Sequence, residues 1–316
     1  MKAATVTRFG ENPRYLDALE PVASGGYEVV VDVVAAALSP RVRSQAEGSH
    51  YTSSGELPVI PGIDGVGRLG DGSLVYFLLP DTAQGAMAER AVIDVRRSVP
   101  LPRDADPLAV AAAMNPVMAS WVALRQRISF TKGHKVMVFG ATGNAGQAAV
   151  QVAHRLGAGE IVAAGREIGR VADLAAHGAT RFVELNADSE DVARNLADAG
   201  KDVDVVVDFL WGEPTRKALY AIIPNRTRDG QTLHWIQIGS VAGGECAIPS
   251  AALRAVDLRL IGSGQGSVDP RQYREEIKIL AREIGDFDVP VRAVPLRDVE
   301  NVWADTSAKE RIVFLP

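Results

Sequence analysis

A glycine-rich turn that joins an apolar strand to a helix constrains the fold of this chain more than any other feature. Val136–Phe139 is apolar throughout, as expected for a parallel strand that is buried on both faces. The turn that follows has the spacing Ala141-x-Gly143-x-x-Gly146, and a helix with an apolar side begins within it. This geometry aims free backbone N–H groups and the positive end of a helix dipole at one point, which suits a pyrophosphate.

We therefore predict a dinucleotide-binding turn. Gly143 would let the backbone approach the phosphates without a Cβ in the way, and Gly146 would let the helix pack close to the strand. The alternative interpretation is an ordinary glycine-rich turn between a strand and a helix. The residues expected to contact the cofactor in this turn are Ala141, Thr142, Gly143, Asn144, Ala145 and Gly146.

The end of the second strand indicates which dinucleotide is bound. This strand leads into Gly165 and Arg166, where NAD-binding units usually carry an Asp or a Glu. An Arg at this point favours the 2′-phosphate of NADP, because its planar fork of donors matches a phosphate, and Arg170 could assist from the next helix. Glu167 argues for NAD, and both arginines could instead be solvated charges at the start of a helix. We predict NADP(H), with Gly165, Arg166 and Arg170 in its binding site.

Composition excludes several classes of protein. The 316 residues are 47% hydrophobic and 23% charged, which is typical of a soluble globular protein. The net charge of −5 argues against nucleic acid or an anionic membrane as the main partner. The single cysteine, Cys246, rules out an intramolecular disulfide framework, so we expect a reducing, cytoplasmic location. Met1–Tyr15 has no apolar core of signal-peptide length. Asn115, Pro116 and Ser120 interrupt the apolar stretch Leu108–Leu124, which predicts a buried helix pair there rather than a membrane span.

Strand and helix signals alternate strictly from Lys135 onward. This alternation predicts an α/β fold with a parallel, doubly wound sheet and right-handed crossovers. The expected strands are 136–139, 161–164, 181–184, 203–208, 232–238 and 257–262, and the expected helices are 144–156, 169–177, 188–198, 213–222 and 271–284. The first 105 residues are instead β-rich, with strands expected at 27–37, 60–69, 74–79 and 87–95. The tail, 290–316, returns to short strands and one short helix.

Several segments together with this layout resemble the medium-chain dehydrogenase/reductase superfamily, and within it the zinc-independent quinone oxidoreductase branch. The segments are Met1-Lys-Ala-Ala, Leu38-Ser-Pro40, Leu57-Pro-Val-Ile-Pro-Gly62-Ile-Asp64-Gly-Val-Gly67, Gly85-Ala-Met-Ala-Glu89, the glycine-rich turn and Arg311-Ile-Val-Phe. The resemblance implies a GroES-like, β-rich substrate and catalytic domain at 1–115 and 286–316. It implies a Rossmann NADP-binding domain at 116–285. It also implies a homodimer, formed by pairing late strands such as Leu258–Ile261 at the edge of the sheet.

Zinc ligands are missing where zinc-dependent relatives carry them. A catalytic zinc needs three protein ligands around an open fourth position. Where those relatives have a Cys in the early loop, this chain has Ser39, and where they read Gly-His-Glu, it reads Gly62-Ile63-Asp64. The lone Cys246 cannot build a four-cysteine structural zinc site. We predict no metal.

Without a Lewis acid, hydride delivery to an acceptor that is already activated is easier than alcohol dehydrogenation. A quinone or an α,β-unsaturated carbonyl accepts hydride while charge develops on oxygen, and the protein has only to position it and stabilise that oxygen. Tyr51 is the candidate donor, because quinone oxidoreductases carry a tyrosine near this place and a phenol can donate to an enolate. His50 is the alternative donor, and Tyr51 could instead only shape the pocket.

Further site residues follow from the carboxyl ends of the strands, outside which open α/β sheets bind ligands. By resemblance, Leu210 and Trp211 flank the adenine. By the same resemblance, Gly239, Ser240, Gly262 and Ser263 line the nicotinamide side. The other positions expected to border the cofactor are Ser39, Ser120 and Arg311. Turn formation or packing is the alternative role for each.

The sequence predicts an NADPH-dependent reductase of a small quinone or enone substrate, with two other classes to weigh. A short-chain dehydrogenase needs Tyr-x-x-x-Lys, and none of the six tyrosines has a lysine four residues on. That class is excluded. The second class is a non-enzymatic NADPH-binding sensor or structural protein on the same fold, which the sequence leaves open because this chemistry demands no signature side chain.

Overall fold

The computed structural model describes residues 1–53, 55–186, 189–306 and 308–316. These residues form two compact units. The first unit contains Met1–Asn115 and Arg274–Pro316, and the second contains Pro116–Tyr273. The chain passes between the units within helices α2 (Pro107–Val122) and α8 (Pro270–Glu283).

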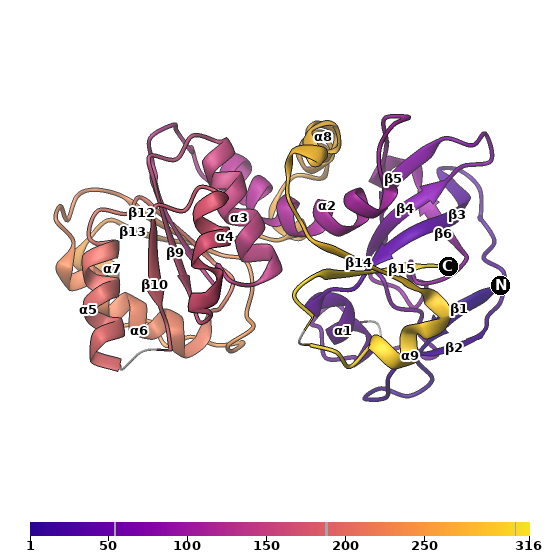
Figure 1. Cartoon of the computed structure of the whole chain (residues 1–316), viewed down its shortest axis with the longest axis horizontal. Coiled ribbons are helices and arrows are strands. Elements are labelled where there is room, and N and C mark those ends of the chain that lie inside the picture. The colour runs from indigo at the N-terminus through magenta and orange to yellow at the C-terminus, as the bar shows by residue number, and fades with distance from the viewer. Residues whose placement is uncertain (54, 187–188, 307) are drawn as a thin grey trace. The chain divides into compact units, whose positions relative to one another are not determined.

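The first unit is built on a largely antiparallel sheet with the strand order β14-β15-β3-β4-β5-β7, in which β6 also pairs with β3 (Figure 1). Its strands are β3 (Glu28–Ala37), β4 (Asp64–Arg68), β5 (Leu74–Leu78), β6 (Arg90–Asp94), β7 (Ser98–Pro100), β14 (Val291–Pro295) and β15 (Arg311–Leu315). A separate pair consists of β1 (Lys2–Thr5) and β2 (Arg14–Asp17). The tail therefore adds β15 beside β3, although nearly the whole chain separates these two strands.

Two local features determine where strand β4 and helix α1 begin. The expected strand 60–69 starts only at Asp64, because Pro61 has no N–H to donate and Gly62 has a φ of +119°. Helix α1 (Pro40–Ala46) follows β3, and the Ser39 hydroxyl caps it by accepting from Val42 N at 3.1 Å. The remaining short helix of this unit is α9 (Val299–Val302).

The second unit is a six-stranded parallel sheet with the order β10-β9-β8-β11-β12-β13. The strands are β8 (Lys135–Phe139), β9 (Glu160–Gly165), β10 (Arg181–Glu184), β11 (Val205–Asp208), β12 (Leu233–Gln237) and β13 (Leu258–Gly262). The predicted doubly wound sheet is confirmed. The strand order reverses between β8 and β11, which pair directly in the register Phe139↔Asp208.

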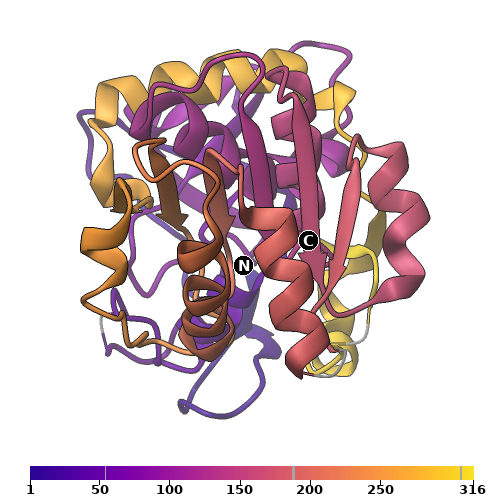
Figure 2. The same ribbon diagram turned by 90° about the vertical axis from the view of Figure 1, so that its left-hand side faces the viewer.

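Helices cover both faces of this sheet, as Figures 1 and 2 show. Helices α3 (Asn144–Arg155) and α4 (Val171–Ala176) lie on one face. Helices α5 (Ser189–Gly200) and α6 (Gly212–Ile222) lie on the other, where Leu196 and Leu219 pack into the same core as Met137 and Trp235. The short helix α7 (Ala252–Ala255) precedes β13.

Helix α2 continues into a π-helical turn, Ala123–Arg127. The combined segment Pro107–Arg127 is long and apolar enough to cross a membrane, but 72% of its most apolar window is buried. Such burial is typical of a core helix in a soluble protein, and it confirms that this stretch is buried. The predicted interruption into a helix pair is wrong, because α2 runs through Pro116 as one helix: burial of the surrounding apolar side chains outweighs the hydrogen bond that the proline removes.

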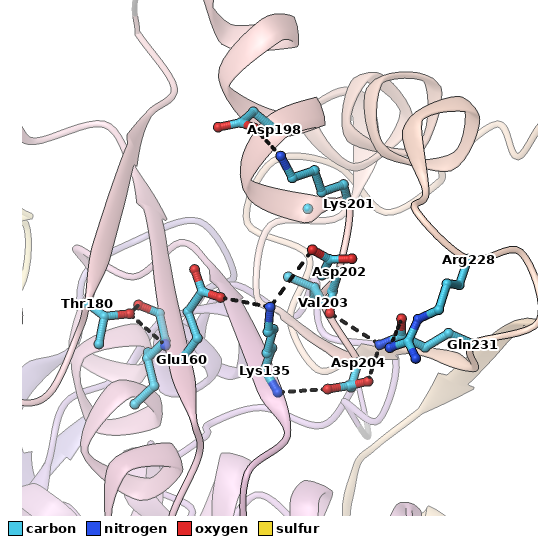
Figure 3. Close-up of polar contacts among 12 residues, drawn as sticks. Lys135, Glu160, Thr180, Asp198, Lys201, Asp202, Val203, Asp204, Arg228 and Gln231 are labelled. Atoms are coloured by element: carbon cyan, nitrogen blue, oxygen red, sulfur yellow. Dashed lines mark hydrogen bonds and ion pairs between the residues drawn. The ribbon is translucent and has the colours of Figure 1, made fainter.

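Polar side chains tie together the amino ends of the parallel strands (Figure 3). Lys135 donates its backbone N–H to Asp204 Oδ2 at 2.8 Å, and its ammonium lies 3.5 Å from Glu160 and 3.9 Å from Asp202. Gln231 donates to the other oxygen of Asp204 at 2.5 Å. This network joins segments at the edge opposite to the one where such sheets bind ligands, so we assign it a structural role.

Candidate functional site

The glycine-rich turn lies at the carboxyl end of β8, where the strand order reverses. Gly140 has a φ of +84°, a backbone conformation that favours glycine. A Cβ at Gly146 would lie 2.1 Å from Gly140 O and 2.6 Å from Ala141 Cα, so the fold itself requires glycine there.

Gly143 differs from its two neighbours. Its φ is −80°, it is exposed, and the nearest atom to an added Cβ would be Gly140 O at 3.5 Å, an ordinary van der Waals distance. Neither backbone conformation nor packing within the protein therefore requires glycine at this position. The open space over Gly143 fits a ligand that approaches the backbone closely, which is the role that a dinucleotide pyrophosphate needs.

The first turn of α3 presents free donors beside Gly143. Gly143 is the N-cap and no side chain caps the helix, so the N–H groups of Asn144, Ala145 and Gly146 have no intrahelical acceptor. Gln147 fixes the turn: its backbone N–H donates to Gly143 O at 2.9 Å and its amide donates to Thr142 O at 3.1 Å. Sequence analysis missed Gln147, whose burial at the start of a helix depends on this backward contact.

The end of β9 lies against the same turn. A Cβ at Gly165 would lie 2.5 Å from Thr142 Cγ2, so glycine keeps the two segments in contact. Arg170 is largely buried and pairs with Glu167, with 3.2 Å between its Nε and the carboxylate. Arg166 is exposed, and among the described residues its guanidinium has no ion pair or hydrogen bond. Glu167 is thus engaged by Arg170, which leaves Arg166 available to a phosphate.

Asp208 organises the turn after β11 and was missed by sequence analysis. Its side chain is fully buried and accepts four hydrogen bonds. Oδ1 accepts from Leu210 N at 2.8 Å and Trp211 N at 3.0 Å, and Oδ2 accepts from Thr215 Oγ1 at 2.6 Å and Trp235 Nε1 at 2.9 Å. No periodicity pattern could have shown that Thr215 and Trp235 converge on one carboxylate.

The turn that Asp208 holds lies beside the glycine-rich turn. A Cβ at Gly140 would meet Leu210 Cδ2 at 3.1 Å. On the other side, Ala242 N donates to Leu210 O at 2.9 Å. Trp211 has a φ of +56° and a ψ of −166°, a combination that is found almost only at glycine.

The ends of β12 and β13 complete this edge. A Cβ at Gly239 would lie 2.8 Å from Phe209 O, whereas nothing lies within 4 Å of one at Gly262. Ser263 N donates to Gln237 O at 2.8 Å, and Ser240 is exposed. Arg127, from the π-helical turn, donates to Gly262 O at 3.0 Å. The structure thus brings together the predicted site residues of the second unit at one edge, except Ser120, which is fully buried in α2 and donates to Val117 O at 3.3 Å.

In the first unit, Tyr51 is 89% exposed and stacks at a tilt on His50, with ring centroids 4.5 Å apart. His50 Nδ1 lies 2.6 Å from Thr52 Oγ1. Burial and the nearby Arg41 charge lower the pKa of His50 below its ordinary value. Tyr51 is the more exposed of the two side chains. Ser39, by contrast, is buried and caps α1.

A buried polar cluster lies elsewhere in the first unit. Tyr76 donates to Asp64 Oδ2 at 2.7 Å, and Arg311 is only 4% exposed. Two guanidinium nitrogens of Arg311, Nε and Nη2, are buried and have no hydrogen-bond partner among the residues that the structure describes. Buried polar groups are rarely left unpaired, so Arg311 has donors to spare for an acceptor outside the chain.

In the described part of the chain, the side chains favour neither metal binding nor thiol chemistry. There, no three His, Cys, Asp or Glu side chains gather as a metal site would require. Ile63 is buried where zinc-dependent relatives would place a histidine. Burial and the nearby Asp208 charge raise the pKa of the Cys246 thiol, which disfavours the reactive thiolate.

Known proteins with this fold include quinone oxidoreductases. The chain is 29% identical to a probable NADPH-dependent quinone reductase of Emericella nidulans, covering 96% of each chain, and 28% identical to a mouse quinone oxidoreductase over 67% of each chain. The structure of the Thermus thermophilus quinone oxidoreductase, also solved with NADPH, superposes over 100% of both chains with a TM-score of 0.79 at 25% identity. No family model matches the chain.

These likenesses define an α/β protein with a GroES-like β-rich domain and a Rossmann domain, as predicted. The chain is similar to the medium-chain dehydrogenase/reductase superfamily, in its quinone oxidoreductase branch, as its sequence segments predicted.

Proposed function

We propose that this chain is a metal-independent reductase that uses NADPH to reduce a quinone or an α,β-unsaturated carbonyl compound. The open space over Gly143, at a helix start with three free N–H donors, is the observation that carries the proposal. The names of the relatives support it, because they include an NADPH-dependent quinone reductase and quinone oxidoreductases.

Residues 116–285 would hold the cofactor and residues 1–115 and 286–316 the substrate. The N–H groups of Asn144, Ala145 and Gly146 would bind the pyrophosphate. Arg166 would bind the 2′-phosphate, with Arg170 held in place by Glu167. The remaining positions proposed to border the cofactor are Ala141, Thr142, Gly165, Leu210, Trp211, Gly239, Ser240, Gly262, Ser263, Ser39, Ser120 and Arg311.

NADPH, when bound, supplies a hydride, which carries two electrons. The acceptor's π-electrons then move to its oxygen, and one proton from the protein or solvent completes the reduction. Tyr51 would stabilise that oxygen through its exposed hydroxyl, donating a hydrogen bond or the proton and regaining it from water. A conjugated acceptor already stabilises the developing charge, so the Ser39, Ile63 and Asp64 positions need no zinc.

We also propose a homodimer in a reducing, cytoplasmic compartment. Strand β13 is the edge strand of the parallel sheet, with Leu258, Leu260 and Ile261 only partly buried. An uncovered apolar edge favours aggregation, and pairing with a second copy would remove that hazard. The single cysteine supports the reducing compartment.

The experiment is a titration with NADPH and NADH, followed by turnover assays against a panel of quinones, enals and enones with and without a chelator. We expect tighter binding of NADPH and chelator-resistant NADPH oxidation with at least one acceptor. Binding of NADPH without turnover of any acceptor would favour a sensor or structural role instead. Equal affinity for both cofactors would contradict the NADPH preference, and one zinc per chain would contradict the metal-free site.

A further inference from the structure

Helix α1 carries a cation in its first turn, and the helix itself does not need one there. Arg41 is the second residue of α1, and no acidic residue lies in that turn. The partial positive charge at a helix start disfavours a cation, so the charge of Arg41 does not stabilise the helix. The side chain is instead held from outside α1, because Nη2 donates to both carboxylate oxygens of Asp81, at 2.8 and 2.9 Å.

Asp81 engages only one of the three guanidinium nitrogens of Arg41. Nε is buried and has no hydrogen-bond partner among the residues that the structure describes. Nη1 has no hydrogen bond or ion pair among them either, and the side chain is 28% exposed. A guanidinium offers five N–H donors in a planar fork. The pair with Asp81 therefore fixes the position of the cation and leaves donors free for a ligand.

The loop that carries Tyr51 is anchored to the same helix. Ser49 N and His50 N donate to Ser44 O, at 3.0 and 3.2 Å, and Ser44 lies one helical turn beyond Arg41. The ring centroids of His50 and Tyr51 are 4.5 Å apart. Arg41 and Tyr51 thus belong to one local piece of the first unit, which consists of α1 and the loop that follows it.

The guanidinium is the end of the Arg41–Asp81 pair that faces this loop. After burial, the Arg41 charge is the main influence that lowers the pKa of His50, and it outweighs the opposing influence of the Asp81 charge. Because the interaction of two charges falls with distance, the guanidinium is nearer to the His50 ring than the carboxylate is. A pair that is neutral as a whole therefore presents its positive side next to Tyr51.

We propose that Arg41 is a specificity-determining residue that binds a carboxylate on the same acceptor that the Tyr51 hydroxyl contacts. This inference rests on the proposed function, and it makes the preferred substrate a conjugated carbonyl compound that carries an acid group. A guanidinium already fixed by a neighbouring carboxylate binds such a group through directed hydrogen bonds without first being ordered. Asp81 cancels much of the positive charge, which favours a singly charged carboxylate over a doubly charged phosphate.

The first test compares an acidic acceptor with its uncharged ester. β-Acetylacrylate and its methyl ester share a conjugated ketone and differ in charge, and both are assayed with NADPH. Arg41→Met should lower kcat/KM for the acid about ten- to hundredfold more than for the ester, as expected for the loss of a hydrogen bond to a charged group. An equal fall with both acceptors, or no fall with either, would overturn the inference.

Two controls define the meaning of that loss. Arg8→Met removes an exposed cation of the same unit, which lies 3.6 Å from Glu11, and should change kcat/KM for neither acceptor. A selective loss for the acid in Arg8→Met would indicate a general effect of charge and overturn the inference. The dissociation constant of NADPH should be the same in Arg41→Met as in the wild type. A weaker binding of NADPH would place Arg41 at a phosphate of the cofactor and would also overturn it.

A measurement on the wild-type protein covers the case in which Arg41→Met fails to fold. Levulinate and methyl levulinate are analogues of the two acceptors that lack the reactive double bond. Levulinate should compete with β-acetylacrylate at lower concentrations than its ester does, and added salt should weaken inhibition by levulinate alone. Equal inhibition by both compounds, or inhibition by neither, would contradict a carboxylate site.

The wild-type assays also separate this inference from the proposed function. If the wild type reduces no quinone, enal or enone with NADPH, the proposed function fails and the inference fails with it. If it reduces uncharged acceptors but not β-acetylacrylate, the inference alone fails.

Discussion

The Tyr76 hydroxyl donates a 2.7 Å hydrogen bond to Asp64, and both side chains are almost completely removed from solvent. Burial raises the pKa of Asp64, whereas the hydrogen bond from Tyr76 and the positive charge of Arg311 lower it. Burial likewise lowers the pKa of Arg311, against the opposing effect of Asp64. The cluster therefore holds a carboxyl group and a guanidinium in a desolvated site of the first unit. The hydrogen bond from Tyr76 is one of the interactions that stabilise the charged form of Asp64.

We predict that Tyr76→Phe destabilises the first unit by about 1–3 kcal/mol at pH 7, the usual cost of leaving a buried polar group without its hydrogen-bond partner. Because the pKa of folded Asp64 is raised, the native state binds more protons than the unfolded state above pH 3.8, and stability falls as pH rises through the folded pKa. Losing the Tyr76 bond raises that pKa further, so the destabilisation should be smaller at acid pH than at pH 7. Thermal unfolding across this range measures it.

The matched control for that prediction is Tyr27→Phe, which removes the hydroxyl of a 57% exposed tyrosine in the same unit. It should unfold like the wild type at every pH. A Tyr76→Phe variant whose loss of stability grows toward acid pH would contradict the assignment of the effect to Asp64.

We predict that Gly143→Ala and Gly146→Ala separate binding from folding. Gly143→Ala should cost about 1 kcal/mol or less of stability, as for an N-cap change, yet weaken NADPH binding about tenfold or more by obstructing the phosphates. Gly146→Ala should be the more destabilising change, because its Cβ would lie 2.1 Å from Gly140 O. Thermal melts and NADPH titrations measure both. Undiminished NADPH affinity in Gly143→Ala would count against the pyrophosphate site.

We predict that Arg166→Ala weakens NADPH binding by one to two decades and leaves NADH binding nearly unchanged. The loss corresponds to about 1.5–3 kcal/mol for a hydrogen bond to a charged group. Arg170→Ala is the comparison variant: since Arg170 already pairs with Glu167, its effect on NADPH should be smaller. Titration of both cofactors decides the matter, and a parallel loss of NADH affinity would show that Arg166 does not contact the 2′-phosphate.

We predict that Leu260→Pro converts a dimer to a monomer, or causes aggregation, without breaking the sheet. Ser263 N donates to Gln237 O, and in a parallel strand alternate residues face the same neighbour, so the N–H of Leu260 points to the free edge. Ile261→Pro, whose N–H faces β12, should instead destabilise the fold. Light scattering measures the molecular mass and so distinguishes monomer, dimer and aggregate. A wild-type protein that is monomeric without aggregation would show that the edge needs no partner.

Hydrophobic patterns and glycine spacing predicted most of the second unit, because its order is local. Each buried strand there is a short apolar run, and β10 and its neighbours lie within two residues of their expected bounds. The glycine-rich turn was likewise readable, since a backbone that approaches a helix or a ligand this closely tolerates no side chain. These features require only neighbours along the chain.

The sequence predicted the first unit less well at positions where turns and caps determine the local structure. The strand expected at 60–69 is shortened by Pro61 and Gly62, whose effect on the ladder depends on which partner strand lies alongside. Ser39 was expected at the cofactor, and the structure shows it capping α1 through its hydroxyl, a use that the residue type alone could not distinguish from ligand binding.

The sequence by itself determined the class of fold, the position of the glycine-rich turn and the position of the arginine that follows the second strand. Buried strands require apolar residues, and close backbone contacts require glycine, so both can be recognised from residue type. Only the tertiary structure decided which polar groups are buried together. Asp208 meets Trp235 across 27 residues and Tyr76 meets Asp64 across 12, and each pairing exists because the sheets bring distant segments into register. The strained Trp211 is likewise invisible in sequence, since its backbone conformation is imposed by hydrogen bonds from a carboxylate that only the folded sheet can bury.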